Sequence, residues 1–332
     1  MIDWYMLFVP AAVLAILLLF RFVGCSFESP LIAEPYVQDV EHDGPVRFYA
    51  MQESPGSTSA IDNSGNLNGR YGDAGPFLLS GADAAHYLSL PIANPSIDLG
   101  APSVEPNEPT DRSVRFNGGF LSAQGPPALS GLERFTVEAL VHPEWDIINQ
   151  RNFYCVVDHT HFVPGISAPG PNRNTGFAIY AGPDDPSDPT SPICWQLWLG
   201  TGRDTTGRGE FARAFPVTGP GPLVSAEDTY LAVQFGDTQA FLWAFTVKAD
   251  FNQVKFEVQH LPYVQPVDPD PRNFVLSIGL SGNFAGLIPP FPSPAGHVIY
   301  PFVGRIADVA VYDTFLDGGR VMSHIMNAFN TT

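Results

Sequence analysis

The sequence predicts an all-β fold, a two-sheet jelly-roll sandwich, preceded by one N-terminal transmembrane helix. The chain of 332 residues contains 33 Pro and 31 Gly, with 12% aromatic and only 15% charged residues, which is typical of a turn-rich β-protein. Short runs of alternating apolar and polar residues recur along most of the chain, as expected of half-buried strands. The N-terminus differs, because it is dominated by one continuous apolar stretch.

Residues 1–25 are predicted to be a transmembrane anchor. Residues 4–20 are apolar without interruption, and the stretch is just long enough to cross a hydrocarbon core of roughly 30 Å if Arg21 extends its charge to the interface. A secretory signal usually begins with a basic segment, which this sequence lacks. We therefore expect an uncleaved anchor that contacts membrane lipid through residues 4–24.

The next segment indicates how the chain is oriented. Residues 26–45 read as a polar, proline-containing tether without periodicity, and their formal charges are acidic. Long domains translocate largely regardless of charge, so we expect a single-pass protein of the cell inner membrane with residues 46–332 on the periplasmic side. An alternative stays open, because residues 22–25 loosely resemble a lipoprotein cleavage site that would leave a lipidated Cys25.

Net charge limits the classes of binding partner, and cysteine spacing indicates whether a disulfide can form. A formal net charge of −18 provides no basic patch to neutralise phosphates, which excludes nucleic acid and favours basic protein partners. Cys155 and Cys194 each lie in a strand-like run, with a further strand expected between them. Strands two apart are separated by about 9.6 Å, too far for a disulfide, so we expect buried free thiols.

Residues 46–332 contain the runs expected to form the sandwich. Residues 316–328 are the one convincing soluble helix, with Asp317 as a cap or first-turn residue and Val321, Ile325 and Phe329 on one face. Long Pro, Gly and Asp-rich insertions are expected to be loops at residues 91–111, 159–175, 183–192, 201–222, 262–273 and 282–301. The predicted strands are residues 46–50, 113–116, 135–142, 153–157, 176–181, 193–199, 230–235, 240–246, 255–259, 274–278 and 304–312.

The order of these strand motifs resembles the concanavalin A-like lectin/glucanase superfamily in its laminin G-like form. Residues 62–69 (DNSGNLNG) resemble the D-x-S-G-N turn that follows an opening strand at residues 46–49. Residues 135–143 (FTVEALVHP) are similar to the F-T-V-E-A-W-V-x-P strand, and residues 302–312 to the closing strand. The resemblance implies a concanavalin A-like jelly roll, but the members of this superfamily differ too widely in function to imply one activity.

Many members of that family hold a structural Ca²⁺, and the resemblance places Asp62 and Glu53 as its candidate ligands here. Ca²⁺ requires several hard oxygen ligands. The closing-strand aspartate of the family is replaced by Ala307, and Asp308 follows on the opposite face if the strand is regular. The other interpretation is an Asx turn stabilised by Asp62 and Asn63 without metal. No other cofactor is expected.

Other candidate sites are interpreted as structural. Some family members hydrolyse glycans with E-x-D-x-x-E, but residues 144–149 (EWDIIN) end in Asn149, so the second essential carboxylate is missing. His159 and His161 lack further ligands at usual metal spacing and are expected in a polar loop. The four tryptophans at alternating positions are expected in the core rather than exposed for sugar stacking, namely Trp145, Trp195, Trp198 and Trp243.

The predicted function is therefore a non-catalytic, membrane-anchored assembly subunit. Its expected partners are integral membrane protein subunits and extrinsic basic proteins. The profile is similar to that of extrinsic stabilising subunits of bacterial photosynthetic reaction-centre and light-harvesting complexes. The alternative is a surface-anchored carbohydrate-binding module, for which a concave sheet face with accessible aromatic side chains would be the discriminating feature.

Overall fold

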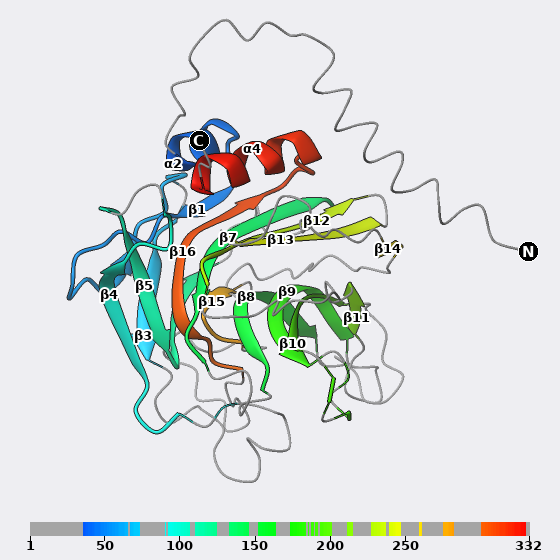
Figure 1. Ribbon diagram of the computed structural model, residues 1–332, viewed down its shortest axis with the longest axis horizontal. Coiled ribbons are helices and arrows are strands. Elements are labelled where there is room, and N and C mark those ends of the chain that lie inside the picture. The colour runs from blue at the N-terminus through cyan, green and yellow to red at the C-terminus, as the bar shows by residue number, and fades with distance from the viewer. Residues whose placement is uncertain are drawn as a thin grey trace, which may run out of the picture. The chain divides into compact units, whose positions relative to one another are not determined.

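A computed structural model shows two stacked antiparallel β-sheets with a helical layer on one of them (Figure 1). It describes residues 36–65, 67–73, 90, 92–106, 110–124, 133–145, 152–163, 173–183, 185, 187–188, 190–191, 193–200, 211–214, 227–236, 239–246, 259–260, 275–281 and 300–329. The predicted anchor lies outside these residues and stays a prediction. No helix in the described part of the chain is long and apolar enough to span a bilayer.

Sheet A carries the helical layer. Its strands are β1 (Arg47–Tyr49), β4 (Ser96–Pro102), β5 (Arg112–Asn117), β7 (Phe135–Pro143), β12 (Thr229–Gly236), β13 (Gln239–Thr246), β14 (Gln259–His260) and β16 (Val303–Tyr312). They are arranged as β14-β13-β12-β7-β16-β5-β4, and β1 pairs with β16. The sequence places β7 and β16 far apart, yet they pair along most of their lengths.

Sheet B lies on the other side of the core. Its strands are β2 (Ser59–Ala60), β3 (Gly69–Asp73), β6 (Gly119–Gln124), β8 (Tyr154–Val163), β9 (Arg173–Pro183), β10 (Ile193–Gly200), β11 (Phe211–Ala214) and β15 (Val275–Ile278). Their order is β11-β10-β9-β8-β15-β6-β3-β2. Because β9 lies between β8 and β10, Cys155 and Cys194 are separated as predicted, and both are buried and not joined in a disulfide.

The main core fills the space between the sheets. In β7, residues of one parity point inward, so that Phe135 stacks on Phe177 of β9 with ring centroids 4.4 Å apart. Residues of the other parity point outward, yet Thr136 and Glu138 are also buried. The outer face of sheet A is therefore covered, and β7 is buried on both faces.

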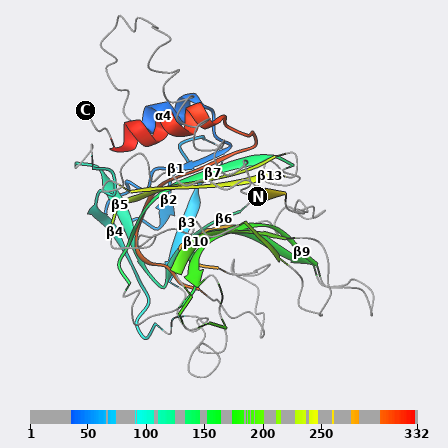
Figure 2. The same cartoon turned by 45° about the vertical axis from the view of Figure 1, so that its right-hand side comes forward.

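Two helices cover that outer face. Helix α2 (Tyr36–His42) lies against α4 (Gly318–Phe329), as Figures 1 and 2 show. Asp317 caps α4, since its Oδ1 accepts hydrogen bonds from the backbone N–H groups of Gly319 and Arg320 at 2.8 and 3.0 Å. The predicted apolar face of α4 is confirmed as buried.

The prediction that residues 26–45 form an irregular tether is wrong for their last part. Residues 36–42 are helical, and Tyr36 and Val40 are completely buried. A helix this short has little stability alone, so its formation depends on the packing against α4. That partner lies at the other end of the sequence and could not be read from local periodicity.

Several predicted loops contain strands. Residues 91–111 include β4, and residues 201–222 include β11. In the range 159–175, residues 159–163 belong to the end of β8 and residues 173–175 to the start of β9. Strand β4 pairs with β5 on one side only, and an edge strand tolerates Pro and Gly that a central strand would not. Of the predicted strand at residues 255–259, the described part is Gln259 in β14.

Candidate functional site

The outer face of sheet B carries a group of aromatic side chains that come from β9, from β10, and from positions just before β8 and β16. Alternation along β10 directs Trp195 into the core and turns Trp198 to the outer face. In β9, Phe177 points inward in the same way and Tyr180 outward. Figure 2 shows that sheet B is curved across β9 and β10, with its hollow side turned away from sheet A.

Four rings meet on this face, and we call them the aromatic cluster: Phe153, Tyr180, Trp198 and Tyr300. Tyr180 and Trp198 lie edge to face with centroids 5.0 Å apart, and Tyr180 and Tyr300 at 5.6 Å. Phe153 contacts Trp198 at 5.5 Å and Tyr300 at 5.3 Å. Phe153 and Tyr180 are each only 4% exposed, whereas Trp198 and Tyr300 are half-buried. The cluster thus presents two rings to the surface on a buried aromatic base.

Trp198 is held in one orientation by its neighbour two residues earlier. Its indole Nε1–H donates to Gln196 Oε1 at 2.9 Å. The Gln196 amide in turn donates from Nε2 to the backbone carbonyls of Gly182 and Pro183 at 3.1 and 3.0 Å. Because Gln196 is almost completely buried, this chain of hydrogen bonds fixes the ring, and little side-chain entropy remains to be lost on binding.

Tyr300 has an unusual backbone conformation. Its φ is 59°, in the left-handed region that non-glycine residues rarely adopt. The Tyr300 carbonyl accepts a hydrogen bond from the backbone N–H of Cys155 at 2.9 Å, which ties this segment to the start of β8. Strained residues persist where the surrounding structure holds them, and they concentrate at ligand-binding positions.

A polar chain lies beside the cluster. The Tyr180 hydroxyl and Ser281 Oγ are 2.6 Å apart, and Ser281 Oγ donates to Asp158 Oδ2 at 2.7 Å. Asp158 Oδ1 also accepts from the backbone N–H of Thr160 at 2.7 Å. Burial and the charge of Asp158 raise the pKa of both the Tyr180 hydroxyl and the Cys155 thiol well above their usual values. Both groups therefore stay protonated at neutral pH.

The strand register continues this polar row across the sheet. Ser122, Ser277, Asp158, Ala178 and Trp198 are successive cross-strand neighbours from β6 to β10. The row ends at Trp198, which belongs to the aromatic cluster, and the other four residues have small side chains. Ser122, Ser277, Asp158 and Ala178 are buried, so Trp198 is the accessible member of this row.

The structure places the predicted calcium ligands in separate hydrogen-bond sets. Asp62 pairs with Arg47 at 3.1 Å and accepts from the backbone N–H groups of Phe48, Ser64 and Leu67 at 3.1, 3.0 and 2.9 Å. Glu53 accepts from the Tyr71 hydroxyl at 2.7 Å and from the backbone N–H of Ile61 at 2.7 Å. Three convergent metal-ligating side chains are not found among the described residues, and calcium binding stays a prediction.

The closing strand is not regular at the position that the family resemblance singles out. The pairing of β16 with β7 shifts between Ala307 and Ala310, and Asp308 adopts a φ of 51°. Asp308 is only 3% exposed and acts electrostatically on Tyr36 of α2. The bulge therefore associates Asp308 with the helical layer.

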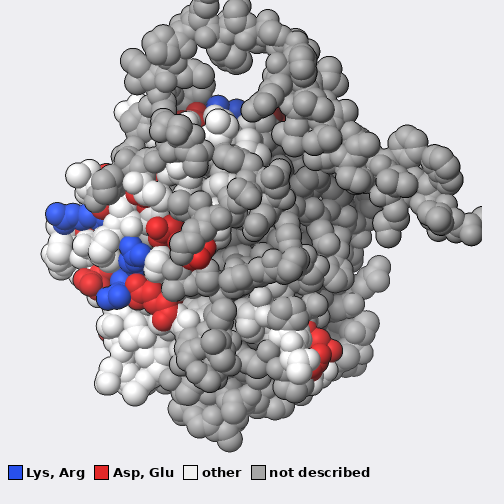
Figure 3. Space-filling view, viewed as in Figure 1, with Lys and Arg blue, Asp and Glu red and all other residues white. Residues whose placement is uncertain are grey.

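Glu144, from the near match to a hydrolase motif, is engaged in ion pairs. Its carboxylate lies 2.7 Å from Arg115 Nε and 3.5 Å from Arg305 Nε. Figure 3 shows charges of both signs side by side over β4 and β5. Asn149 lies outside the described residues. Glu144 thus joins neighbouring strands, and the absence of enzymatic activity stays a prediction.

Two predictions about histidine and tryptophan positions were wrong in part. His159 is in β8 rather than a loop, with its ring 5.5 Å from Phe177 in the core, and His161 follows on the same strand. Trp145 and Trp195 are core residues as predicted, but Trp198 and Trp243 are on the outer faces and half-buried. Tyr300 and Ser281 were not found from the sequence, because they border a Pro-rich stretch without periodicity.

No family model and no curated protein sequence matches this chain. Among solved structures, the chain is similar to the binding domain of botulinum neurotoxin serotype D, with a TM-score of 0.44, 11% identity and coverage of 86% of this chain and 51% of that one. A GH54 α-L-arabinofuranosidase gives a TM-score of 0.47 and 12% identity over 82% of this chain and 50% of that one.

A Trypanosoma rangeli sialidase gives a TM-score of 0.40 and 11% identity over 86% of this chain and 32% of that one. This chain spans about half the length of the first two proteins and a third of the sialidase. At such TM-scores the similarity assigns neither a ligand nor an activity, so a functional conclusion depends on the residues described above.

Proposed function

We propose that this chain is a non-catalytic carbohydrate-binding protein that holds a neutral glycan on Trp198 and Tyr300. The observation that carries the proposal is the pair of half-buried rings on the curved face of sheet B, one fixed by Gln196 and the other held at a φ of 59°. Rings fixed before binding lose little entropy when a ligand stacks on them. An aromatic side chain that only covers the surface could change rotamer freely and would not need such hydrogen bonds.

A glycan is the ligand class that fits these rings best. Sugar rings have apolar C–H faces and polar hydroxyl edges, so they combine stacking on an aromatic side chain with hydrogen bonds beside it. Tyr300 adds a phenolic hydroxyl to its ring, and both Tyr300 and Trp198 are half-buried. Asp158 and Ser277 beside them are buried and support the face from below.

The charge of the chain selects among glycans. A net charge of −18 repels sulfated and sialylated chains, especially at low ionic strength. A neutral polysaccharide meets no such barrier. We therefore expect binding of neutral glycans that is nearly insensitive to salt.

Hydrolysis is not part of the proposal, for a geometric reason. Among the described outward positions of β8, β9, β10 and β15, Asp158 is the only carboxyl group, and it is 2% exposed with its oxygens engaged by Ser281 and Thr160. Retaining glycosidases need two carboxyl groups about 5 to 5.5 Å apart. One buried carboxylate cannot supply both nucleophile and acid.

Substitution of either accessible ring tests the proposal. In affinity electrophoresis through gels containing neutral β-glucan, galactan or xylan, Trp198→Ala and Tyr300→Ala are each expected to weaken retention about 30-fold, because an interface Trp or Tyr is typically worth about 2 kcal/mol. Denaturant midpoints are measured alongside, to separate lost contact from lost folding.

Trp243→Ala is the matched control. Trp243 is also half-buried on an outer sheet face, and its Nε1–H donates to Gln234 Oε1 at 2.6 Å, but it lies on sheet A. It should keep full retention. If wild-type protein is retained by none of the neutral gels and instead co-migrates with integral membrane proteins in mild detergent, the assembly-subunit prediction would replace this proposal.

A further inference from the structure

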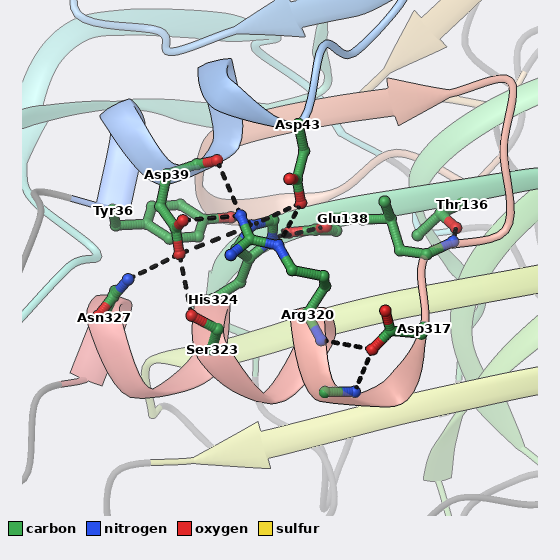
Figure 4. A network of polar contacts seen from close by, with 12 residues as sticks. Tyr36, Asp39, Asp43, Thr136, Glu138, Asp317, Arg320, Ser323, His324 and Asn327 are labelled. Carbon is green, nitrogen blue, oxygen red and sulfur yellow. Dashed lines mark hydrogen bonds and ion pairs between the residues drawn. The ribbon is translucent and has the colours of Figure 1, made fainter. Parts of the chain in front are cut away.

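A buried carboxylate and a buried histidine meet beneath the helical layer of sheet A. Glu138 lies in the middle of β7 on its outward face, and His324 lies on the inward face of α4, both completely buried (Figure 4). His324 Nδ1 is 2.9 Å from Glu138 Oε2 and 3.0 Å from Oε1. A buried charge is tolerated only when it is paired and hydrogen-bonded, so this contact fixes where α4 lies on the sheet.

Two tyrosine hydroxyls donate hydrogen bonds to the Glu138 carboxylate. The Tyr230 hydroxyl donates to Glu138 Oε2 at 2.7 Å, and the Tyr36 hydroxyl donates to the same oxygen at 3.4 Å. These donors come from β12 and α2, so the sheet and the first helix both support the carboxylate. Burial, followed by the charge of Glu138, raises the pKa of both phenols well above the usual value, which keeps them protonated donors.

The other nitrogen of the His324 ring faces further carboxylates. Nε2 lies 3.3 Å from Asp43 Oδ2 and 3.8 Å from Asp39 Oδ2, both on the α2 side. A protonated ring presents an N–H on each side, and so it bridges β7 and α2 at once. Arg320 Nη2 lies 3.4 Å from Nε2, so a neutral ring with its proton on Nδ1 still donates to Glu138 and accepts from Arg320. Loss of the second proton removes the ionic attraction between the ring and the three carboxylates.

Arg320 joins the two helices independently of this ring. It lies 2.7 Å from Asp39 Oδ1 and 2.8 Å from Asp43 Oδ2. Asp39 also accepts from Asn327 Nδ2 at 2.7 Å and Ser323 Oγ at 3.2 Å, as Figure 4 shows. The helices therefore stay paired to each other, while the contact between His324 and Glu138 adds an ionic link to the sheet beside the apolar packing and the Tyr36 hydrogen bond.

We propose that α2 and α4 form a pH-responsive clasp, which is closed over sheet A while His324 carries a proton and loosens when that proton is lost. Small outward residues on β12 and β16 make room for the helices, including Ala232, Ala307 and Ala310. Loosening would uncover these together with the apolar residues around them. The clasp is a property of the opposite sheet from the aromatic cluster and does not depend on the proposed glycan binding.

The charge balance of the whole cluster sets the direction of the response. With His324 protonated, the charged groups are two cations and four carboxylates, and loss of the proton leaves Arg320 as the cation. The charged and titratable groups, by element, are Tyr36 and Asp39 from α2, Asp43 directly after it, Glu138 from β7, Tyr230 from β12, Asp308 and Tyr312 from β16, and Arg320 and His324 from α4.

The pKa directions give the pH window. Burial of His324 disfavours its charge, but the hydrogen bond and charge of Glu138, with Asp39 and Asp43, outweigh burial and raise its pKa. A group with a raised pKa stabilises the fold fully below its unfolded value, about 6.5 for His, and loses that contribution as pH rises through the folded value. For Asp39, burial is outweighed by Arg320 and His324, so its pKa is lowered and its contribution is lost only as the solution becomes strongly acid.

Hydrogen exchange of α4 tests the clasp. Between pH 6 and pH 9, after correction for the intrinsic exchange rate, opening of α4 in the wild-type protein should increase roughly tenfold, the value of one hydrogen bond to a charged group. The amides of β9 should not change. In His324→Gln, which cannot gain the charge, α4 should be open at both pH values with no pH dependence.

His142→Gln is the matched control. His142 also pairs through Nδ1 with a carboxylate, Asp228 Oδ1 at 2.7 Å, but it is partly exposed and its partner directly precedes β12 instead of belonging to either helix. That variant should retain the wild-type pH response. If His324→Gln fails to fold, the titration of the wild-type His324 ring nitrogens by NMR replaces it. Unchanged protection of α4 between pH 6 and 9, or a His324 ring that titrates at its ordinary value, would overturn the proposal.

Discussion

Replacing Asp62 by alanine is expected to destabilise the folded domain by about 3–5 kcal/mol, because it leaves a buried charge without its partner. The side chains of Arg47 and Asp62 are both fully buried, and Arg47 Nη1 is 3.1 Å from Asp62 Oδ2. The variant also removes the acceptor for three backbone N–H groups of the turn and β1, those of Phe48, Ser64 and Leu67. Urea denaturation monitored by fluorescence gives the free energy of unfolding.

The neighbouring residue provides the control for this substitution. Asn63 is exposed in the same turn, and its amide contacts Glu41 at 3.3 Å. Asn63→Ala should change the free energy of unfolding by no more than about 0.5 kcal/mol. A loss below about 1 kcal/mol for Asp62→Ala would mean that Arg47 finds another partner or reaches water, contrary to the buried pair described here.

Gly176→Ala is expected to have a comparable effect on β8 and β9. Gly176 has a φ of +82°, and a methyl group there would meet the backbone carbonyl of His159 and lie 3.1 Å from Thr160 Cα. Neither neighbour can move without breaking the strand pair, so we expect a loss of at least about 3 kcal/mol. Tyr180 of β9 is part of the base of the aromatic cluster, and Asp158 of β8 is linked to it through Ser281. Glycan retention should therefore fall together with stability.

Gly65→Ala separates the backbone effect from the clash. Gly65 has a φ of +76°, but no atom lies within 4 Å of the position that its Cβ would take. This variant should lose only about 1 kcal/mol, the conformational cost alone. Equal losses in the two glycine variants would show that the close approach of β8 and β9 is not rigid.

The strand pattern of the sequence predicted the sandwich because alternation is a local property. In β7 the apolar residues of one parity identified a strand, and the structure confirms it between residues 135 and 143. The same pattern could not show that Glu138 is buried, since its cover comes from helices at the two ends of the domain. Burial on the second face of a sheet is a tertiary property, and neither parity nor composition encodes it.

The candidate site was harder to predict than the fold for a similar reason. Trp195 and Trp198 lie in one strand with opposite parity, and the sequence does not tell which face is the core when both faces carry aromatic residues. Tyr300 gave no signal, because its left-handed φ and its contact with Phe153 depend on a backbone hydrogen bond to β8. Asp62 was singled out as a calcium ligand because the turn motif is local, and that role stays a prediction. Its pairing with Arg47 became clear only in three dimensions.

The indole N–H resonances of the five tryptophans provide the most direct test of the central claim. Each Trp gives one ¹H–¹⁵N signal, and Trp198→Ala and Trp243→Ala assign the two on the outer sheet faces. During titration with neutral oligosaccharides, the Trp198 signal is expected to move in a saturable manner while the Trp243 signal stays in place. If saturating neutral oligosaccharides leave the Trp198 signal unchanged, the outer face of sheet B is not a glycan-binding surface.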